Sequence, residues 1–260
     1  MRTYYDTIYL APHLDDAALS CGGQIHQLTA VGKPVLIVTI MAGDPPEDVV
    51  YSDFARELHE RWDLAVAAEA ARREEDAAAC QILGADFVHW SIPDCVYRMH
   101  PKTGLPLYPT WEDVVTAVHP AEFQLIQTLA TRMAHLPPTD RIVAPLGVGN
   151  HADHLVTRQA AELCFGAKLC YFEDYPYVQE EGAITAVIPA NTSTWQCHTI
   201  PLNATDISAK IKAIIAYKSQ LSTFFTDYQD LTRQIETYAQ QTGGECLWQH
   251  TQSALPEVEK

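Results

Sequence analysis

An uninterrupted apolar run at residues 34–41 (PVLIVTIM) most constrains the fold of this chain. It is rich in β-branched residues and does not alternate with polar ones, which is typical of a strand buried on both faces. Shorter runs of the same kind occur at 7–11, 87–90, 141–144 and 168–172, and helical patterns lie between them at 17–30, 54–83, 122–135 and 151–165. This alternation predicts an α/β fold with a Rossmann-like, mostly parallel sheet flanked by helices.

Two parts of the chain depart from this alternation. Residues 91–112 contain four prolines and no clear period, so we expect a long functional or covering loop. After residue 176 the pattern favours a hairpin (183–188 with 194–200) and then helices at 207–222 and 227–240. We therefore predict one domain over 1–260, with a core at about 5–175 and a C-terminal hairpin and helix extension at about 176–260.

Composition excludes several classes of partner. The net charge of −16 and the absence of a basic run disfavour nucleic acid and anionic lipid. No apolar stretch is long enough for a membrane span, and the N-terminus does not resemble a signal peptide. Seven cysteines without a C-x-x-C pair predict reduced core thiols in a cytoplasmic protein. A homo-oligomer is possible, although nothing in the sequence fixes the oligomeric state.

Two polar clusters follow predicted strands of this sheet, where an open α/β sheet places its active site. The first is PHLDD at 12–16, in which His13 and Asp16 can both reach one cation while Asp15 points elsewhere. The second is GNHADH at 149–154, in which His151 and His154 share one face of a helix start. A third ligand from the second cluster would complete a His/Asp/His zinc site with an open position for water.

Each cluster alone has a simpler interpretation. Asp15 or Asp16 could cap the helix that starts near Ala17, and paired histidines on a helix surface are common. Two such clusters after strands of one sheet are harder to explain this way, because buried carboxylates and imidazoles are costly side by side without a cation.

The two clusters together resemble the PIG-L/LmbE-like N-acetylglucosamine deacetylases, a family that includes the deacetylases of GPI-anchor, mycothiol and bacillithiol biosynthesis. Weaker similarities in the right order span most of residues 5–250. They are Arg72-x-x-Glu75 with Ile82-Leu83-Gly84, Pro93-Asp94, Lys218-Ser219-Gln220 and Cys246-Leu247-Trp248. The resemblance implies hydrolysis of an N-acetyl group on an N-acetylglucosamine-type sugar or glycoside.

The resemblance also implies roles for individual residues. His13, Asp16 and His154 would be Zn²⁺ ligands, and Asp15 would be the general base. His151, held by Asp153, would stabilise the oxyanion or act as an acid. A carboxylate two residues from His151 should favour its imidazolium form. Arg72 and Asp94 are implied to hold sugar hydroxyls, although Arg73 aligns as well as Arg72. The usual H-P-D-D-E motif reads His13-Leu14-Asp15-Asp16-Ala17 here, which leaves the substrate in doubt.

Other readings stay open at this point. The metal site would serve a non-sugar N-acyl substrate equally well, and the same ligands could bind Fe²⁺, Mn²⁺ or Co²⁺. A nucleotide-binding module would need G-x-G-x-x-G after the first strand, which is absent. A metal-binding protein without catalysis would be expected to lack Asp15 or His151, and both are present.

Overall fold

The computed structural model describes residues 1–47, 51–61, 68–189 and 194–251. Its centre is a seven-stranded sheet in the order β3-β2-β1-β4-β5-β7-β6. The first five strands are parallel, and β7 and β6 continue the sheet in antiparallel pairing. The strands are β1 (Tyr5–Ala11), β2 (Val35–Thr39), β3 (Asp86–His89), β4 (Thr139–Pro145), β5 (Leu169–Phe172), β6 (Trp195–Ile200) and β7 (Glu245–His250). The predicted α/β fold with a mostly parallel sheet is confirmed.

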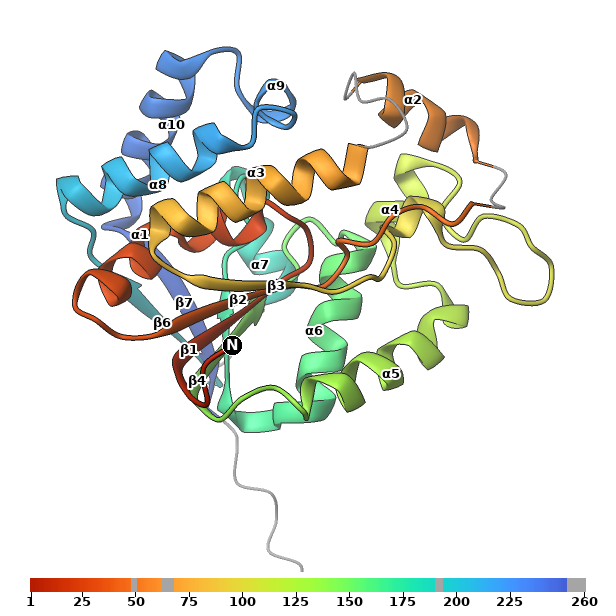
Figure 1. The fold of residues 1–260 in the computed structure, drawn as a ribbon, viewed down its shortest axis with the longest axis horizontal. Helices are drawn as coiled ribbons and strands as arrows, with labels where there is room; N and C mark the ends of the chain where they lie inside the picture. The colour runs from red at the N-terminus through yellow and green to blue at the C-terminus, as the bar shows by residue number, and fades with distance from the viewer. Residues whose placement is uncertain (48–50, 62–67, 190–193, 252–260) are drawn as a thin grey trace, which may run out of the picture.

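Helices cover both faces of the sheet, as Figure 1 shows. One face carries α1 (Asp16–Ala30), α3 (Ala68–Leu83), α8 (Ala204–Ala216) and α10 (Tyr228–Thr242). The other carries α5 (Phe123–Met133), α6 (Ala152–Phe165) and α7 (Ala183–Val187). Shorter elements lie above the carboxyl ends of the strands or connect these helices, namely α2 (Asp53–Arg61), α4 (Trp111–Thr116), α9 (Leu221–Phe224), η1 (Cys95–Tyr97), η2 (Pro120–Glu122), η3 (Gly166–Lys168) and η4 (Tyr177–Gln179).

The buried parts of the central strands are mostly apolar because each of their faces meets a separate core. In β1, Tyr9 packs with the α1 and α3 side, whereas Ile8 and Leu10 pack with the α5 and α6 side. Ile8 lies opposite Leu36 of β2 and Ile142 of β4, so the second core continues across three strands. Burial of both faces explains why these strands show no polar alternation.

The C-terminal part completes the same sheet. The Lys210 ammonium of α8 donates to the Glu245 carboxylate of β7 at 2.7 Å, and both side chains are buried. Gly22 lets α8 approach α1 closely, because a Cβ atom there would lie 3.1 Å from the Cγ atom of Lys210. These contacts support the proposal that residues 1–260 form one domain.

Three predicted elements differ from the structure. The hairpin of 183–188 with 194–200 is wrong, because 183–187 forms helix α7 and β6 pairs with β7. The predicted helix 54–83 comprises α2 and α3, and its middle, 62–67, lies outside the described residues. The predicted loop 91–112 contains η1 and the start of α4, where Thr110 and Asp113 form a capping box.

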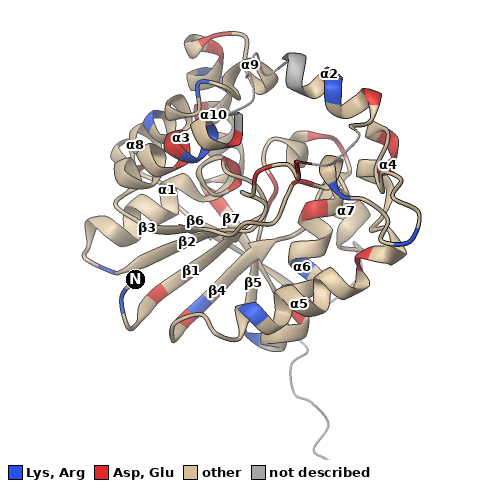
Figure 2. Ribbon diagram, turned by 45° about the vertical axis from the view of Figure 1, so that its right-hand side comes forward, with Lys and Arg blue, Asp and Glu red and all other residues tan. Residues whose placement is uncertain are grey.

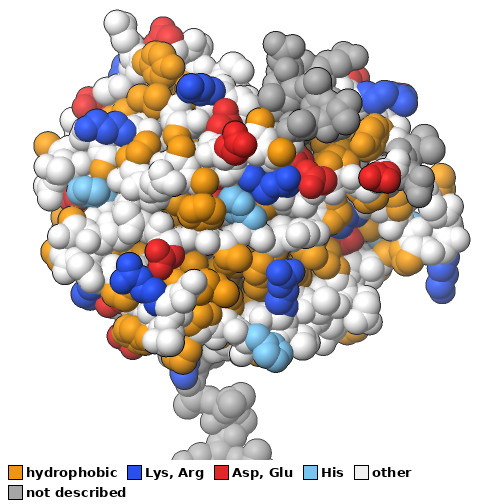
Figure 3. All heavy atoms as spheres, in the orientation of Figure 1, with side chains coloured by type: hydrophobic (Ala, Val, Ile, Leu, Met, Phe, Trp, Pro, Cys, Tyr) orange, Lys and Arg blue, Asp and Glu red, His pale blue; other side chains and the backbone are white. Residues whose placement is uncertain are grey.

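The surface and the thiols add two findings. All seven cysteines are free, and Cys21, Cys80 and Cys95 are buried, but Cys197 is exposed, so the prediction of core thiols holds only in part. In the described part of the chain, no helix is both long and apolar enough to cross a bilayer. On the face in Figure 3, Lys and Arg side chains are scattered among acidic and apolar ones.

Candidate active site and metal centre

The predicted site residues surround one cavity of about 1140 Å³. It lies beyond the carboxyl ends of β1 and β4, the neighbouring strands at which the strand order reverses. Open α/β sheets bind ligands at this switch point. The wall includes all the predicted site residues except Asp153, namely His13, Asp15, Asp16, Arg72, Asp94, His151 and His154.

The turn after β1 is fixed by Asp16. Its Oδ2 atom accepts a hydrogen bond from the His13 backbone N–H at 2.7 Å. Asp15 occupies the N-cap position of α1, but its side chain makes no capping hydrogen bond. The simpler interpretation of Asp15 as a capping residue is therefore wrong, and its carboxylate is left to line the cavity.

The loop after β4 brings His151 and His154 to the same cavity. Gly147, Gly149 and Asn150 all have positive φ angles, which turn the chain sharply after the strand. A side chain at Gly149 would also meet the Tyr177 ring, since a Cβ atom there would lie 3.1 Å from Cγ of that residue. His151 is the N-cap of α6, and His154 follows in its first turn.

His13, Asp16 and His154 have the spacing of metal ligands. The Asp16 Oδ2 atom lies 3.3 Å from Nδ1 of His13 and 3.4 Å from Nε2 of His154. With zinc–ligand bonds of about 2.0–2.1 Å, neighbouring donors of a tetrahedron lie about 3.3–3.4 Å apart. The two measured distances thus fit two edges of a zinc coordination tetrahedron.

The imidazoles of His13 and His154 each contact a buried carboxylate through the nitrogen that does not face Asp16. Nε2 of His13 lies 3.0 Å from Asp153 Oδ2, and Nδ1 of His154 lies 2.6 Å from Asp174 Oδ1. Such a carboxylate fixes the tautomer of a histidine and orients its other nitrogen toward a metal. Nδ1 of His13 and Nε2 of His154 are thereby the free ligand atoms, and both face Asp16.

The electrostatics of this cluster favour a positive charge at its centre. Burial alone lowers the pKa of His13, but hydrogen bonds to Asp153 and Asp16 outweigh it and place that pKa well above the usual value. Burial acts to raise the pKa of Asp16, yet the His154 and His13 charges hold it well below its usual range. A divalent cation can supply the same positive charge, so the residues present fit a metal ion.

Asp153 was expected to hold His151, and this expectation is wrong. Its carboxylate accepts hydrogen bonds from the Cys95 N–H (2.9 Å) and Arg98 (2.5 Å) and contacts His13. Arg98 is buried and also pairs with Glu122 at 2.7 Å. This ion pair holds the guanidinium group that contacts the Asp153 carboxylate. In the described part of the chain, the hydrogen bond between Asp153 and His151 involves the backbone and not the carboxylate. The Asp153 N–H donates to His151 Nδ1 at 3.3 Å.

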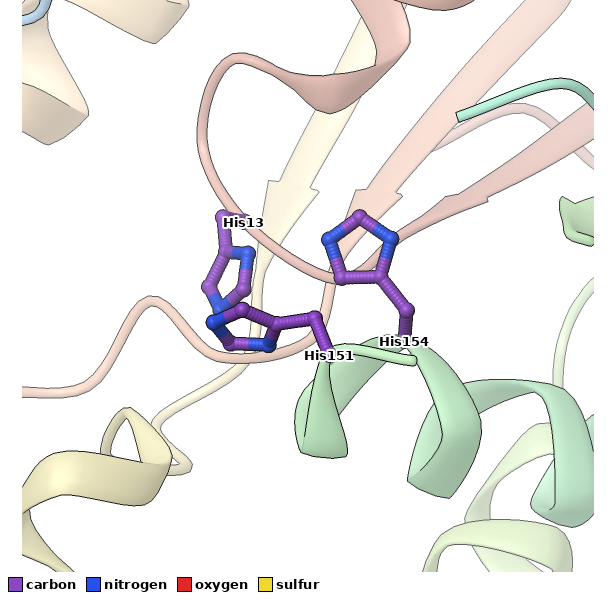
Figure 4. Close-up of side chains that lie close together, drawn as sticks. All are labelled: His13, His151 and His154. Atoms are coloured by element: carbon purple, nitrogen blue, oxygen red, sulfur yellow. The ribbon is translucent and has the colours of Figure 1, made fainter. Parts of the chain in front are cut away.

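The surroundings of His151 favour its neutral form. Figure 4 shows its ring beside those of His13 and His154, and nitrogens of the three rings lie within 4.8 Å of one another. Burial and then the charges of His13 and His154 lower the pKa of His151 well below its usual value, although Asp153 acts in the opposite direction. The predicted imidazolium form is thus not favoured. Because Nδ1 accepts a hydrogen bond, the neutral ring carries its proton on Nε2.

Asp15 has the properties of a general base near neutral pH. Burial, followed by the neighbouring Asp16 charge, raises its pKa to about 6, whereas Arg72 and His13 act to lower it. Only 7% of the residue is exposed. A carboxylate with a pKa close to the working pH exchanges protons efficiently with water and with a leaving group.

The structure separates Arg72 from its neighbour Arg73. Arg72 is buried in the cavity wall beside Glu69, with a 3.4 Å contact between the two side chains. Arg73 instead donates to the Ala42 carbonyl oxygen and to Asp44. Asp94 lines the cavity and also caps η1 by accepting the Val96 N–H at 3.1 Å.

Three residues have roles at the site that were not predicted from the sequence. Asp174 directly follows β5, so the rule that sites gather at carboxyl ends of strands could have indicated it. Arg98 lies among irregular residues after η1 and carries no local signal. Trp111, at the start of α4, lines the cavity with its ring centroid 6.1 Å from that of His151.

Comparison with known proteins agrees with this site. Residues 8–165 match the PIG-L family, described as GlcNAc-PI de-N-acetylase. A 2'-N-acetylparomamine deacetylase from Streptomyces fradiae is 28% identical over 225 residues, covering 82% of this chain and 73% of that protein. One from Niallia circulans is 24% identical over 237 residues, covering 84% and 82%.

Solved structures give the same result. The zinc-inhibited form of teicoplanin deacetylase has a TM-score of 0.76 at 25% identity and covers 95% of this chain and 99% of its own. The deacetylase of A40926 pseudoaglycone has a TM-score of 0.72 at 25% identity, with 96% and 99% coverage. This chain belongs to the PIG-L family. It is an N-deacetylase, a hydrolase that cleaves an amide C–N bond.

Proposed function

We propose that this chain removes the acetyl group from the nitrogen of an N-acetylated amino sugar, with a zinc ion held by His13, Asp16 and His154. The observation that carries the proposal is the placement of Asp16 Oδ2, 3.3 Å and 3.4 Å from the two imidazole nitrogens. When bound at such a site, zinc polarises a carbonyl group and makes water more acidic at neutral pH.

Asp15 acts as the base in this proposal. Its carboxylate lines the cavity beside the ligand residues without a capping hydrogen bond of its own. It accepts a proton from the attacking water and then delivers it to the leaving nitrogen, because a neutral His151 has no spare proton for that step. One group with a pKa near neutrality can serve in both directions.

His151 stabilises the developing oxyanion. Its Nδ1 atom accepts the Asp153 N–H, so Nε2–H is the donor left for substrate. A fixed donor aimed at the carbonyl oxygen becomes more favourable as negative charge develops there. Asp153 is a positioning residue, since its carboxylate contacts His13.

The substrate class follows from the wall of the cavity and from the relatives. Arg72 and Asp94 lie in the wall and offer a donor and an acceptor for sugar hydroxyls. The relatives include deacetylases named for paromamine and teicoplanin. We extend the proposal to a cytoplasmic location, which the seven free thiols support.

Metal analysis combined with a substrate panel tests the proposal. Protein purified without chelator should contain about one zinc per chain, and acetate release should be faster from N-acetylglucosamine glycosides than from simple N-acetyl amines. Asp15→Ala should retain the metal and lose turnover by at least about 10²-fold. Retained activity in this variant would exclude Asp15 as the base. Equal rates on both substrate groups would favour a non-sugar acyl substrate. If the purified protein contains Fe²⁺, Mn²⁺ or Co²⁺, that ion takes the place of zinc in the proposal.

A further inference from the structure

Two thiols and a carboxylate that the reaction does not use meet at the antiparallel end of the sheet. Cys197 lies on the edge strand β6 and Cys246 lies on β7. Figure 2 shows acidic positions on the loops that follow the strands, and Glu173 is the first residue after β5. The two Sγ atoms and a carboxylate oxygen of Glu173 all lie within 4.8 Å of one another. None of the three residues lines the cavity of the site described above, so the cluster is separate from it.

The strand pairing brings these three side chains together. In the antiparallel pair of β6 and β7, Cys197 lies opposite Trp248. Cys246 comes two positions before Trp248 on β7, so the two cysteines are diagonal neighbours on one face of the sheet. On its other side β7 pairs with β5, and this register continues so that Glu173 comes opposite Cys246. The three side chains therefore join three neighbouring segments of the sheet.

The spacing of the two cysteines disfavours a disulfide and suits a metal ion. Both thiols are free, and diagonal residues of antiparallel strands have Cα atoms about 7–8 Å apart, whereas a disulfide requires about 4.4–6.8 Å. Zinc holds thiolates without joining them. With Zn–S bonds of about 2.3 Å and Zn–O bonds of about 2.0–2.2 Å, neighbouring donors of a tetrahedron lie about 3.5–3.8 Å apart. The limit of 4.8 Å exceeds these spacings by only about 1 Å, which rotation of the side chains can supply.

The Glu173 carboxylate is already held in position beside the thiols. Its Oε1 atom accepts a hydrogen bond from Nε1–H of Trp248 at 2.8 Å, and its Oε2 atom accepts one from the Tyr238 hydroxyl of α10 at 2.7 Å. Carboxylates that bind metals are typically oriented by such hydrogen bonds, and each oxygen keeps a lone pair for the ion. In the described part of the chain, Glu173 forms no ion pair. A cation at this cluster would therefore balance a charge that otherwise faces two thiols.

We propose that Cys197, Cys246 and Glu173 form a second zinc site, which fastens the edge strand β6 to β7 and β5 and takes no part in the deacetylase reaction. Two thiolates and one carboxylate supply three ligands and leave a fourth position for water. Cys197 is exposed, so the ion enters from solvent, and binding releases the two thiol protons. The thiolates select Zn²⁺ over Mg²⁺, Ca²⁺ and Mn²⁺, and the carboxylate disfavours Cu⁺.

Cobalt substitution tests this site, because Co²⁺ bound to thiolate has a near-ultraviolet charge-transfer absorption that a His/Asp/His site lacks. The full chain, stripped of metal and kept reduced with a phosphine, should bind about two Co²⁺ ions and show this absorption. Cys197→Ser and Cys246→Ser should each bind about one ion fewer and lose most of the absorption. Glu173→Gln keeps an acceptor for Trp248 and should lower zinc affinity at this site by at least about 10-fold.

Two further variants assign the absorption to this cluster. Cys164→Ser changes a half-buried thiol on α6 and should keep both ions and the absorption. Asp16→Asn removes a proposed ligand of the catalytic metal and should also keep the absorption.

Three results would overturn the second site. They are a parent protein without the thiolate absorption, an absorption that persists in both Cys197→Ser and Cys246→Ser, and a disulfide between these cysteines in peptides of the purified, unreduced protein. Because Cys197 is exposed, Cys197→Ser should fold like the parent protein, which thermal unfolding checks.

Discussion

The carboxylate of Asp153 lies 3.0 Å from Nε2 of His13, although 140 residues separate them in the chain. The contact joins the loop after β1 to the first turn of α6. It also fixes which nitrogen of His13 can face a metal. His13 and its supporting carboxylate thus come from the two different sequence clusters, at 12–16 and 149–154.

Removing the charge of Asp153 should weaken metal binding. Asp153→Asn keeps the size of the side chain but replaces a charged carboxylate, which contacts His13, the Cys95 N–H and Arg98, with a neutral amide that has one acceptor oxygen. We therefore expect metal affinity to fall by about 10- to 100-fold. Competition with a chromogenic chelator measures this. Asp140→Asn, an exposed carboxylate on β4, is the control and should bind metal like the parent protein. Unchanged affinity in Asp153→Asn would mean that its contact with His13 has no part in holding the metal.

The acid limb of the pH–rate profile should depend on Arg72. Asp15 acts as a base only when ionised, so kcat/KM should fall as the pH drops through its pKa, raised to about 6 by burial and Asp16. A bound divalent cation favours the ionised form and places the limb at or below this value. Arg72 also favours the ionised form. Arg72→Gln should therefore move the limb to higher pH.

Two further variants control this experiment. Arg72→Lys keeps a positive charge and should leave the limb near its original position. Arg73→Gln changes the next residue of the same helix, whose side chain contacts Ala42 and Asp44, and should not move the limb. The assignment fails if Arg72→Gln folds, retains measurable activity and titrates like the parent protein.

The proposed metal ligands could be predicted from the sequence because they lie in local sequence patterns. His13 and Asp16 follow one buried strand directly, His154 follows another, and parallel strands bring their carboxyl ends to one edge of the sheet. The pairing of these ligands with their supporting residues could not be predicted in this way. Asp174 also follows a strand, β5, but its contact with His154 depends on β5 lying beside β4. Arg98 reaches Asp153 from a segment without a periodic pattern.

The error at α7 has a similar cause. Residues 183–188 are rich in β-branched side chains, which favour a strand. The other half of the predicted hairpin, β6, pairs with the distant strand β7. Ile184 and Val187 instead pack as a helix against the core on the α5 and α6 side. Tertiary packing, which the local sequence does not show, overrode the propensity.

Neutral His151 predicts a specific kinetic result. His151→Ala removes a fixed oxyanion donor and should lower kcat by about 10²- to 10³-fold with a smaller change in KM. Because burial and the His13 and His154 charges lower the pKa of His151, its neutral form persists as the pH rises. The parent protein should lose no activity through His151 between about pH 7 and 9. A basic limb in this range that disappears in His151→Ala would instead indicate an imidazolium acid.

The loop before His151 should tolerate a side chain poorly. Gly149 has a φ of +85°, and a Cβ atom there would lie 3.1 Å from Cγ of Tyr177. Gly149→Ala should therefore combine backbone strain of about 1–2 kcal/mol with displacement of Tyr177.

Gly104→Ala is the matched control, since Gly104 also has a positive φ (+67°) but no atom within 4 Å of a Cβ. Thermal unfolding of both variants separates the two effects. Gly149→Ala should have the lower Tm, and it should also lose kcat because His151 lies two residues away. Equal Tm values and unchanged kcat would mean that Tyr177 yields at no cost and that the loop does not set the position of His151.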